Sequence, residues 1–269
     1  MAVALAQAGR KVGVVDAVGP DADNFRTGDR VAYITRGYGS YATARLIDSN
    51  LLVRLPESVD DVTAASTLLR GLTAEMLVRQ VFPVLPGHVV LVQAAAGGVG
   101  RLLCRWASHL GATVIGTVGS EEKAVIAAAN GCHHTILYRT ENFVEKVKHI
   151  TNGRGVDVAY DSVGKDTFLG SLECLAVRGH LANFGQSSGA IDPFRISLLF
   201  AKSNSISRPG VFHYFTGGDR EPMAATLFAA LADGVISADR HHDYAFSDAG
   251  QAHHDMEERR TAGAVLLKI

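Results

Sequence analysis

The sequence has little of what marks a secreted, a nucleic-acid-binding or a membrane protein. Its three cysteines, Cys104, Cys132 and Cys174, are far apart, which fits neither a disulfide framework nor a zinc cluster and suits a reducing compartment. A formal net charge of −1 without a basic run disfavours nucleic acid and anionic membranes as partners. No apolar run reaches the roughly eighteen residues of a membrane-spanning helix. We therefore expect a cytoplasmic protein whose cysteines are small buried side chains.

The most informative stretch is residues 89–100, Val-Val-Leu-Val-Gln-Ala-Ala-Ala-Gly-Gly-Val-Gly, in which an apolar strand runs into a glycine-rich turn. Against the dinucleotide-binding pattern G-x-G-x-x-G, the first glycine is replaced by Ala95, and Gly97 and Gly100 match. Residues 99–110 follow with apolar side chains at helical spacing. A strand, a glycine turn and a helix are the context in which backbone N–H groups receive a pyrophosphate.

Short β-branched runs alternate with helical patterns from residue 88 to about 208. We expect strands at 88–93, 112–117, 134–138, 156–161, 180–185 and 203–208, with helices near 99–110, 121–130, 141–151, 166–176 and 195–202. This alternation predicts an α/β fold with a doubly wound parallel sheet.

The flanking regions have different patterns. Residues 12–55 predict short strands at 12–18, 30–34, 40–44 and 51–55, separated by turn residues. After Pro209 we expect a helix at 222–233, a strand at 244–246, a helix from 247 to about 259 and a strand at 264–269. The simplest architecture is a β domain into which a dinucleotide-binding unit is inserted.

Several motifs together resemble the zinc-free quinone oxidoreductases of the medium-chain dehydrogenase/reductase superfamily. They are Ala94-Ala-Ala-Gly-Gly-Val-Gly, Gly116-Thr-Val-Gly-Ser, Tyr160-Asp-Ser-Val-Gly, Phe184-Gly, the turn series 18–33 and the closing segment 252–263. The resemblance implies a GroES-like catalytic domain formed by residues 1–71 and 209–269, and a Rossmann NADPH-binding domain formed by 72–208. It also implies homodimers that pass reducing equivalents from NADPH to quinones without a metal.

The beginning of the chain departs from this resemblance. Only eleven residues precede Val12, whereas a complete GroES-like domain would have about fifty more. We therefore expect an N-terminally incomplete, truncated β domain with unpaired strand edges. Two alternatives follow for the function: a family member that binds NADPH with little or no turnover, and a reductase of other activated alkenes such as 2-alkenals.

The end of the second strand of the expected sheet argues for NADPH over NADH. An NAD enzyme has Asp or Glu there to bind the ribose hydroxyls, whereas this chain has Gly119 and Ser120. Lys123, one turn into the next helix, can reach a 2′-phosphate as a point charge. Ser120 is alternatively a simple N-cap, with Glu121 and Glu122 complementing the helix dipole.

The resemblance assigns the remaining cofactor contacts residue by residue. Gly97, Gly98 and Val99 match the pyrophosphate turn, and Tyr138 matches a tyrosine beside the adenosine phosphate, although it could be only a strand-end aromatic. The other matching positions are Thr73, Ser162, Phe184, Gly185, Arg208 and Arg259. Surface arginines are the competing interpretation of the last two positions, and a family tyrosine contact is replaced by Met76.

Hydride transfer to a quinone needs no metal and no strong general acid, because the reduced oxygen can take its proton from water. We therefore name no catalytic residue. Tyr41 and Thr73 are candidates for lining the site, and Tyr41 is alternatively a core aromatic on its strand.

Two other patterns favour different chemistry and are weaker. Residues 185–189 satisfy G-x-S-x-G, but a nucleophile elbow turns directly into a helix, and here Ser187 is followed by a loop-forming sequence. The histidine pairs at 133–134, 241–242 and 253–254 lack metal-binding spacing. We expect neither a serine hydrolase nor a metal site.

Overall fold

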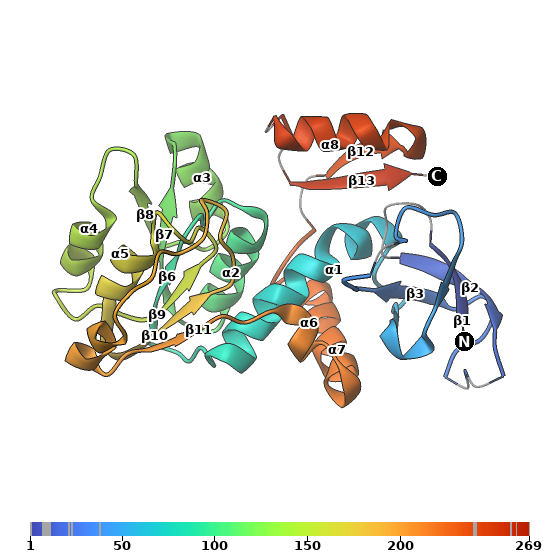
Figure 1. Cartoon of the computed structure of the whole chain (residues 1–269), viewed down its shortest axis with the longest axis horizontal. Coiled ribbons are helices and arrows are strands. Elements are labelled where there is room, and N and C mark those ends of the chain that lie inside the picture. Colours follow the sequence, from blue (N-terminus) through green and yellow to red (C-terminus); the bar gives the residue numbers. More distant parts are fainter. Residues whose placement is uncertain are drawn as a thin grey trace. The chain divides into compact units, whose positions relative to one another are not determined.

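The chain forms two units from interleaved segments. The computed structural model describes residues 2–6, 12–20, 22, 24–37, 39–238, 241–258, 260–261 and 263–268 (Figure 1). One unit comprises Met1–Leu72 and Val211–Ile269, and the other is Thr73–Gly210. Among the described residues, no helix combines the length and the apolar character needed to span a bilayer.

The unit Thr73–Gly210 is built around a six-stranded sheet with the order β11-β10-β9-β6-β7-β8. All neighbouring strands are parallel, which confirms the predicted doubly wound sheet. The strands are β6 (Val89–Val92), β7 (Thr113–Val118), β8 (His134–Leu137), β9 (Val156–Asp161), β10 (Leu175–Asn183) and β11 (Ser205–Ser207). The chain order reverses between β6 and β9, and ligands bind at the carboxyl ends of the strands beside such a switch point.

Helices cover both faces of this sheet (Figure 1). They are α2 (Gly98–His109), α3 (Glu121–Ala129), α4 (Phe143–Ile150) and α5 (Phe168–Glu173), with a π-helical segment η2 (Met76–Val81) before the sheet and a 3₁₀ segment η3 (Ile196–Lys202) before β11. Each helix turns an apolar stripe inward, and the buried cluster includes Leu91, Ile115, Val147, Phe168, Leu172 and Leu181.

Two boundaries expected for this unit are wrong. The helix expected near 166–176 ends at Glu173, and the following strand begins at Leu175 instead of 180. The cause is an irregularity in the β9–β10 register between Leu175 and His180, where Arg178 has a positive φ of 64°. A short kinked strand segment here resembles the end of a helix in sequence.

The other unit contains a five-stranded antiparallel sheet with the order β4-β1-β2-β3-β5. Its strands are β1 (Ala2–Ala6), β2 (Val12–Val18), β3 (Arg30–Tyr33), β4 (Arg45–Ile47) and β5 (Leu52–Arg54), with a 3₁₀ turn η1 (Ser49–Leu51) before the last. Its buried cluster includes Val15, Phe25, Val31, Tyr33, Ile47 and Leu52.

The strand expected at 40–44 is wrong. Residues 41–44 form bends, and the strand lies at β4, where Val3 pairs with Leu46. The pairing partner β1 was not predicted as a strand, so nothing in the sequence fixed the position of β4.

Helix α1 (Asp61–Glu75) follows β5, and the C-terminal part adds α6 (Val211–Tyr214), α7 (Arg220–Ala232) and α8 (Ala249–Glu257). Two 3₁₀ turns, η4 (Gly217–Asp219) and η5 (Phe246–Asp248), precede α7 and α8. Strands β12 (His241–Ala245) and β13 (Ala264–Lys268) pair in parallel on either side of α8 in the sequence.

Candidate cofactor site

The turn between β6 and α2 presents backbone donors at the carboxyl edge of the sheet. The N–H of Gly97 donates to the carbonyl oxygen of Ala94 over 2.8 Å, and Gly97 is the N-cap of α2 without a side-chain cap. The N–H groups of the first helical turn, Gly98, Val99 and Gly100, have no partners within the helix by its geometry. Such a helix start is suited to bind a phosphate.

Small residues are required behind this turn. A Cβ atom on Gly100 would lie 2.3 Å from the carbonyl oxygen of Ala94, and one on Gly116 of β7 would lie 2.5 Å from the methyl carbon of Ala95. Ala95 itself is fully buried. The alanine that replaces the first glycine of the pattern is therefore accommodated by a glycine on the neighbouring strand.

The segment after β7 brings four of the predicted residues together. A Cβ on Gly119 would lie 2.9 Å from the hydroxyl oxygen of Tyr138, so the exposed tyrosine side chain packs against the glycine. Ser120 is the N-cap of α3 and accepts a hydrogen bond from the Lys123 N–H over 3.4 Å, which confirms the N-cap alternative. The side chain of Lys123 is exposed at the same helix start.

Acidic side chains share this helix start. The Ser120 hydroxyl hydrogen bonds to Glu122 and lowers the pKa of that exposed carboxyl. Ser120 therefore interacts with both Glu122 and the Lys123 backbone, while the ammonium group of Lys123 supplies positive charge. Both predicted roles of Ser120, cap and phosphate neighbour, are compatible with this geometry.

The ends of β9 and β10 hold the next group of predicted residues. The Phe184 N–H donates to the Asp161 carbonyl over 2.9 Å, and the Ser187 N–H donates to the Ser162 carbonyl over 3.1 Å. A Cβ on Gly185 would lie 2.7 Å from the Ser162 carbonyl oxygen. Ser162, Phe184 and Gly185 therefore form one closely packed loop pair at the same edge as the turn before α2.

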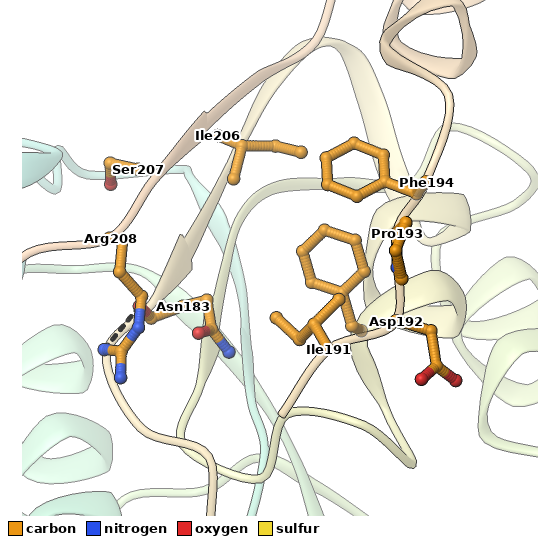
Figure 2. Close-up of a pocket in the computed structure, with 9 residues that line it drawn as sticks. Asn183, Ile191, Asp192, Pro193, Phe194, Ile206, Ser207 and Arg208 are labelled. Carbon is orange, nitrogen blue, oxygen red and sulfur yellow. Dashed lines mark hydrogen bonds between the residues drawn. The ribbon is translucent and has the colours of Figure 1, made fainter. Parts of the chain in front are cut away.

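Arg208 follows β11 and is one of the residues that line a cavity of about 460 Å³ (Figure 2). Its guanidinium donates to the Asn183 carbonyl oxygen over 3.1 Å. The other lining residues are mostly apolar: Phe168, Ile191, Asp192, Pro193, Phe194, Ile206 and Ser207. Arg208 is exposed yet held against the end of β10, which distinguishes it from a freely solvated arginine.

The remaining predicted residues lie elsewhere in the chain. Thr73 is half-buried near the end of α1, and Met76, at the position of the family tyrosine, is fully buried in the core. Arg259 lies outside the described residues. Its neighbour Arg260 pairs with Asp255 over 3.4 Å.

Tyr41 is not the core aromatic that one alternative described. Its side chain is 51% exposed and lies on a bend, and its hydroxyl is 2.8 Å from Nε2 of His253 on α8. Both side chains border a small cavity of about 160 Å³ with Arg70 and Met256. The hydroxyl and imidazole are therefore presented to solvent as a polar pair.

The patterns that favour a serine hydrolase or a metal site find no support in the described residues. Residues 184–195 form a loop, and no helix follows Ser187 until η3, so the nucleophile-elbow pattern lacks its required turn into a helix. Within the described ranges, no group of three or more His, Cys, Asp or Glu is arranged to bind a metal. All three cysteines are buried, as predicted, and burial raises the pKa of Cys174 to about 12.

The sequence analysis missed a set of buried polar residues beneath the carboxyl edge. They are Gln93, Thr117, Asp161, Ser171 and Asn183. A polar residue directly after a run of buried strand residues, as at Gln93, is the signal that could have indicated them.

Known proteins share this architecture over nearly the whole chain. Residues 98–229 match a family model described as zinc-binding dehydrogenase. The chain is 43% identical to a 2-haloacrylate reductase of Burkholderia over 94% of this chain and 78% of that protein. It is 39% identical to a quinone oxidoreductase of Pseudomonas aeruginosa over 95% of this chain and 79% of that protein.

A solved structure gives the same result. The Escherichia coli quinone oxidoreductase, crystallised in complex with NADPH, superposes with a TM-score of 0.90 at 39% identity, covering 96% of this chain and 80% of that one. With this extent of identity and structural agreement, the chain belongs to the quinone oxidoreductase family of the medium-chain dehydrogenases/reductases.

Proposed function

We propose that this protein reduces quinones with NADPH and without a metal ion. The observation that carries the proposal is the cradle at the carboxyl edge of the sheet, formed by the turn at Gly97–Val99 and the segment Gly119–Lys123. The turn offers N–H groups of a helix start, and Lys123 at the start of α3 supplies positive charge for a 2′-phosphate. A relative of 39% identity was crystallised with NADPH. Backbone donors at Gly97–Val99 and the positive charge of Lys123 at the same edge of the sheet support the proposal.

The proposed contacts follow the order of the strands. Gly97, Gly98 and Val99 bind the pyrophosphate, and Gly119, Ser120, Lys123 and Tyr138 surround the adenosine 2′-phosphate. Ser162, Phe184, Gly185 and Arg208 bind the nicotinamide half. We further propose that residues 72–208 form the NADPH-binding domain, and that residues 1–71 and 209–269 form a GroES-like catalytic domain that supplies Tyr41 and Arg259, with Thr73 at the boundary.

The chain's residues position and shield the reactants in this proposal. NADPH, when bound, supplies a hydride, and a quinone that gains this hydride and one proton becomes a hydroquinone. The proton can come from water, because the reduced oxygen is basic enough to take it. The site has to align the two rings and exclude water from the hydride path, so Tyr41 and Thr73 are proposed as lining residues and no general acid is assigned.

A second acceptor class has its own support. The relative of 43% identity is named a 2-haloacrylate reductase, and a crystal structure of a 2-haloacrylate reductase, 42% identical, superposes with a TM-score of 0.93. An activated alkene takes the hydride on carbon, and the same cofactor cradle serves both reactions. The acceptor, and not the cofactor, distinguishes the two candidate functions.

We propose a homodimer formed through the β11 edge of the sheet. Among the described residues, β11 is the last strand of its sheet, and no other strand pairs with its outer edge. The adjoining η3 segment exposes Ile196, Leu198 and Phe200 to 73%, 50% and 87%. Exposed apolar side chains next to an open strand edge are characteristic of an association surface, and a second copy would pair the edge with itself about a two-fold axis.

We also propose a cytoplasmic location. Support comes from the three free thiols, all of them buried, since free cysteines persist in a reducing compartment.

The test is to measure binding and turnover separately. NADPH binding is followed by the fluorescence of the reduced nicotinamide, and oxidation by its absorbance, with panels of quinones, 2-alkenals and 2-haloacrylates. Oxidation with quinones and tight NADPH binding supports the proposal. Turnover restricted to alkenes favours the second acceptor class, binding without turnover indicates a nucleotide-binding protein, and absence of NADPH binding contradicts all three.

A further inference from the structure

A chain of buried polar side chains runs beneath the proposed cofactor site. Gln93 follows β6, Thr117 lies in β7, Asp161 ends β9 and Ser171 lies in α5, and each is at most 1% exposed. Polar groups so deeply buried must find hydrogen-bond partners inside the protein. Their partners form a connected path across three strands.

Asp161 is the end point of this path. Its carboxylate accepts from the backbone N–H groups of Val163 at 2.8 Å and Gly164 at 3.0 Å. It also accepts from the hydroxyls of Thr167 at 2.8 Å and Ser171 at 3.1 Å. A carboxylate can only accept, so the Ser171 hydroxyl hydrogen points to Asp161.

This direction fixes every other hydrogen along the path. Because the Ser171 hydroxyl donates to Asp161, its oxygen accepts from the side-chain amide N–H of Gln93 over 3.0 Å. The Gln93 amide oxygen then accepts from the Thr117 hydroxyl over 2.5 Å. The Thr117 oxygen in turn accepts from the backbone N–H of Ala94 over 3.3 Å. One consistent direction of donation leads from Ala94 to Asp161, with Gln93 as the bridge.

Both ends of the path hold segments of the proposed site. Ala94 opens the pyrophosphate turn with a positive φ of 54°, and its carbonyl oxygen accepts from Gly97. At the other end, the Asp161 carboxylate holds the two N–H groups that follow Ser162, and its backbone carbonyl holds Phe184. The path therefore joins the segment proposed for the pyrophosphate to the segment proposed for the nicotinamide half.

We propose that Gln93 is a positioning residue for the dinucleotide. By bridging Thr117 and Ser171, it sets the pyrophosphate turn at a fixed position relative to the loop at Ser162, so that one rigid edge receives both halves of the cofactor. The inference rests on the proposed binding of NADPH. It makes a specific claim beyond that binding: a change at one end of the path alters affinity for groups bound at the other.

The experiment uses NADPH and a fragment, 2′-phospho-ADP-ribose, which keeps the pyrophosphate and lacks the nicotinamide. Ser171→Ala removes the hydroxyl that lies on the Asp161 side of Gln93. We expect it to weaken the fragment about fivefold or more although the change is on the nicotinamide side. Thr117→Val should weaken both ligands by a similar factor, and the double variant should lose less than the product of the two factors, because both act through Gln93.

Two matched variants separate positioning from stability. Thr117→Ser keeps the hydroxyl and loses the methyl group, so affinity should return to the wild-type value even if the melting temperature falls. Thr151→Val removes a hydroxyl that bonds to the Val147 carbonyl at the opposite edge of the same unit, so it should lower stability without changing either affinity.

The outcomes are distinguishable. A wild-type protein that binds neither ligand overturns the proposed function and this inference with it. A wild-type protein that binds both, combined with unchanged fragment affinity in Ser171→Ala or fully multiplicative losses in the double variant, overturns the inference alone. If Thr117→Val does not fold, Ser171→Ala with the fragment decides the question.

Discussion

The two units differ in how they present chemistry. In Thr73–Gly210 the sheet is parallel and covered on both faces, and its backbone forms the candidate cradle from glycines, helix ends and buried polar bonds. In the other unit, the antiparallel strand β2 is buried at Val12, Gly13 and Val15 and exposed at its other positions, and the candidate side chain, Tyr41, is half exposed beside His253. On the proposed assignment, affinity for the cofactor would come from backbone geometry, whereas binding of the acceptor would depend on exposed side chains.

The largest effect is expected from adding a methyl group to the cradle. Gly100→Ala would place a Cβ 2.3 Å from a backbone oxygen, and the turn can relieve this only by moving. We expect a loss of stability of roughly 3 kcal/mol and loss of measurable NADPH binding, checked by thermal unfolding and fluorescence titration. Gly218→Ala in the other unit, where a Cβ would meet nothing within 4 Å, is the control. If the two variants gave similar results, NADPH binding would not depend on the backbone of the turn before α2, and the contrast between the two units would fail.

The second prediction concerns the proposed dimer and introduces a charge on the exposed apolar surface of η3. Phe200→Asp places a carboxylate in the most exposed part of the η3 surface, where Phe200 is 87% exposed. We expect the variant to be monomeric at concentrations where the wild type is dimeric, a shift of about 100-fold or more in the dissociation constant, measured by light scattering after size exclusion. Val125→Asp on α3, also well exposed, should leave the dimer intact. A wild-type monomer, or a dimeric Phe200→Asp protein, would rule out this surface.

Reversing one charge tests the choice of cofactor. Lys123→Glu places a third carboxylate beside Glu121 and Glu122 at the start of α3. We expect NADPH affinity to fall about tenfold or more while NADH affinity changes little, because only NADPH carries the 2′-phosphate. Lys148→Glu on α4, a partly exposed lysine paired with Glu173, serves as the charge control. An equal loss for both cofactors would show that Lys123 does not bind the phosphate.

The smallest effect is expected at Tyr41. Tyr41→Phe removes the hydroxyl that lies 2.8 Å from His253, an exposed contact worth about 1 kcal/mol or less. We expect kcat to change less than about threefold and NADPH affinity to remain unchanged, as steady-state kinetics would show. A fall in kcat of about 100-fold would instead identify Tyr41 as a proton donor and contradict the proposal that the site has no general acid.

Much of the unit Thr73–Gly210 could be predicted because its signals are local. A buried strand, small residues at a turn and an apolar helical stripe lie within residues 89–110, and a cap residue such as Ser120 marks the next helix start. The antiparallel unit was harder because the position of β4 depends on its pairing with β1, in which Ala4 pairs with the distant Arg45. The buried path through Gln93 was missed for the same reason, since its residues come from β7, β9, α5 and the segment after β6.

The contact between Ala95 and Gly116 shows what the glycine pattern of this turn constrains. It limits the total side-chain volume that the turn and the neighbouring strand can place in the same space. Space exists for one methyl group between β6 and β7, and Ala95 occupies it. The arrangement is not symmetrical, because a Cβ on Gly116 would also lie 2.7 Å from the sulfur of Cys132. The methyl group can therefore be removed from position 95, but moving it to position 116 requires a smaller side chain at 132. A search for such turns that scored these three positions jointly would recognise this variant, which a linear pattern counts as a mismatch.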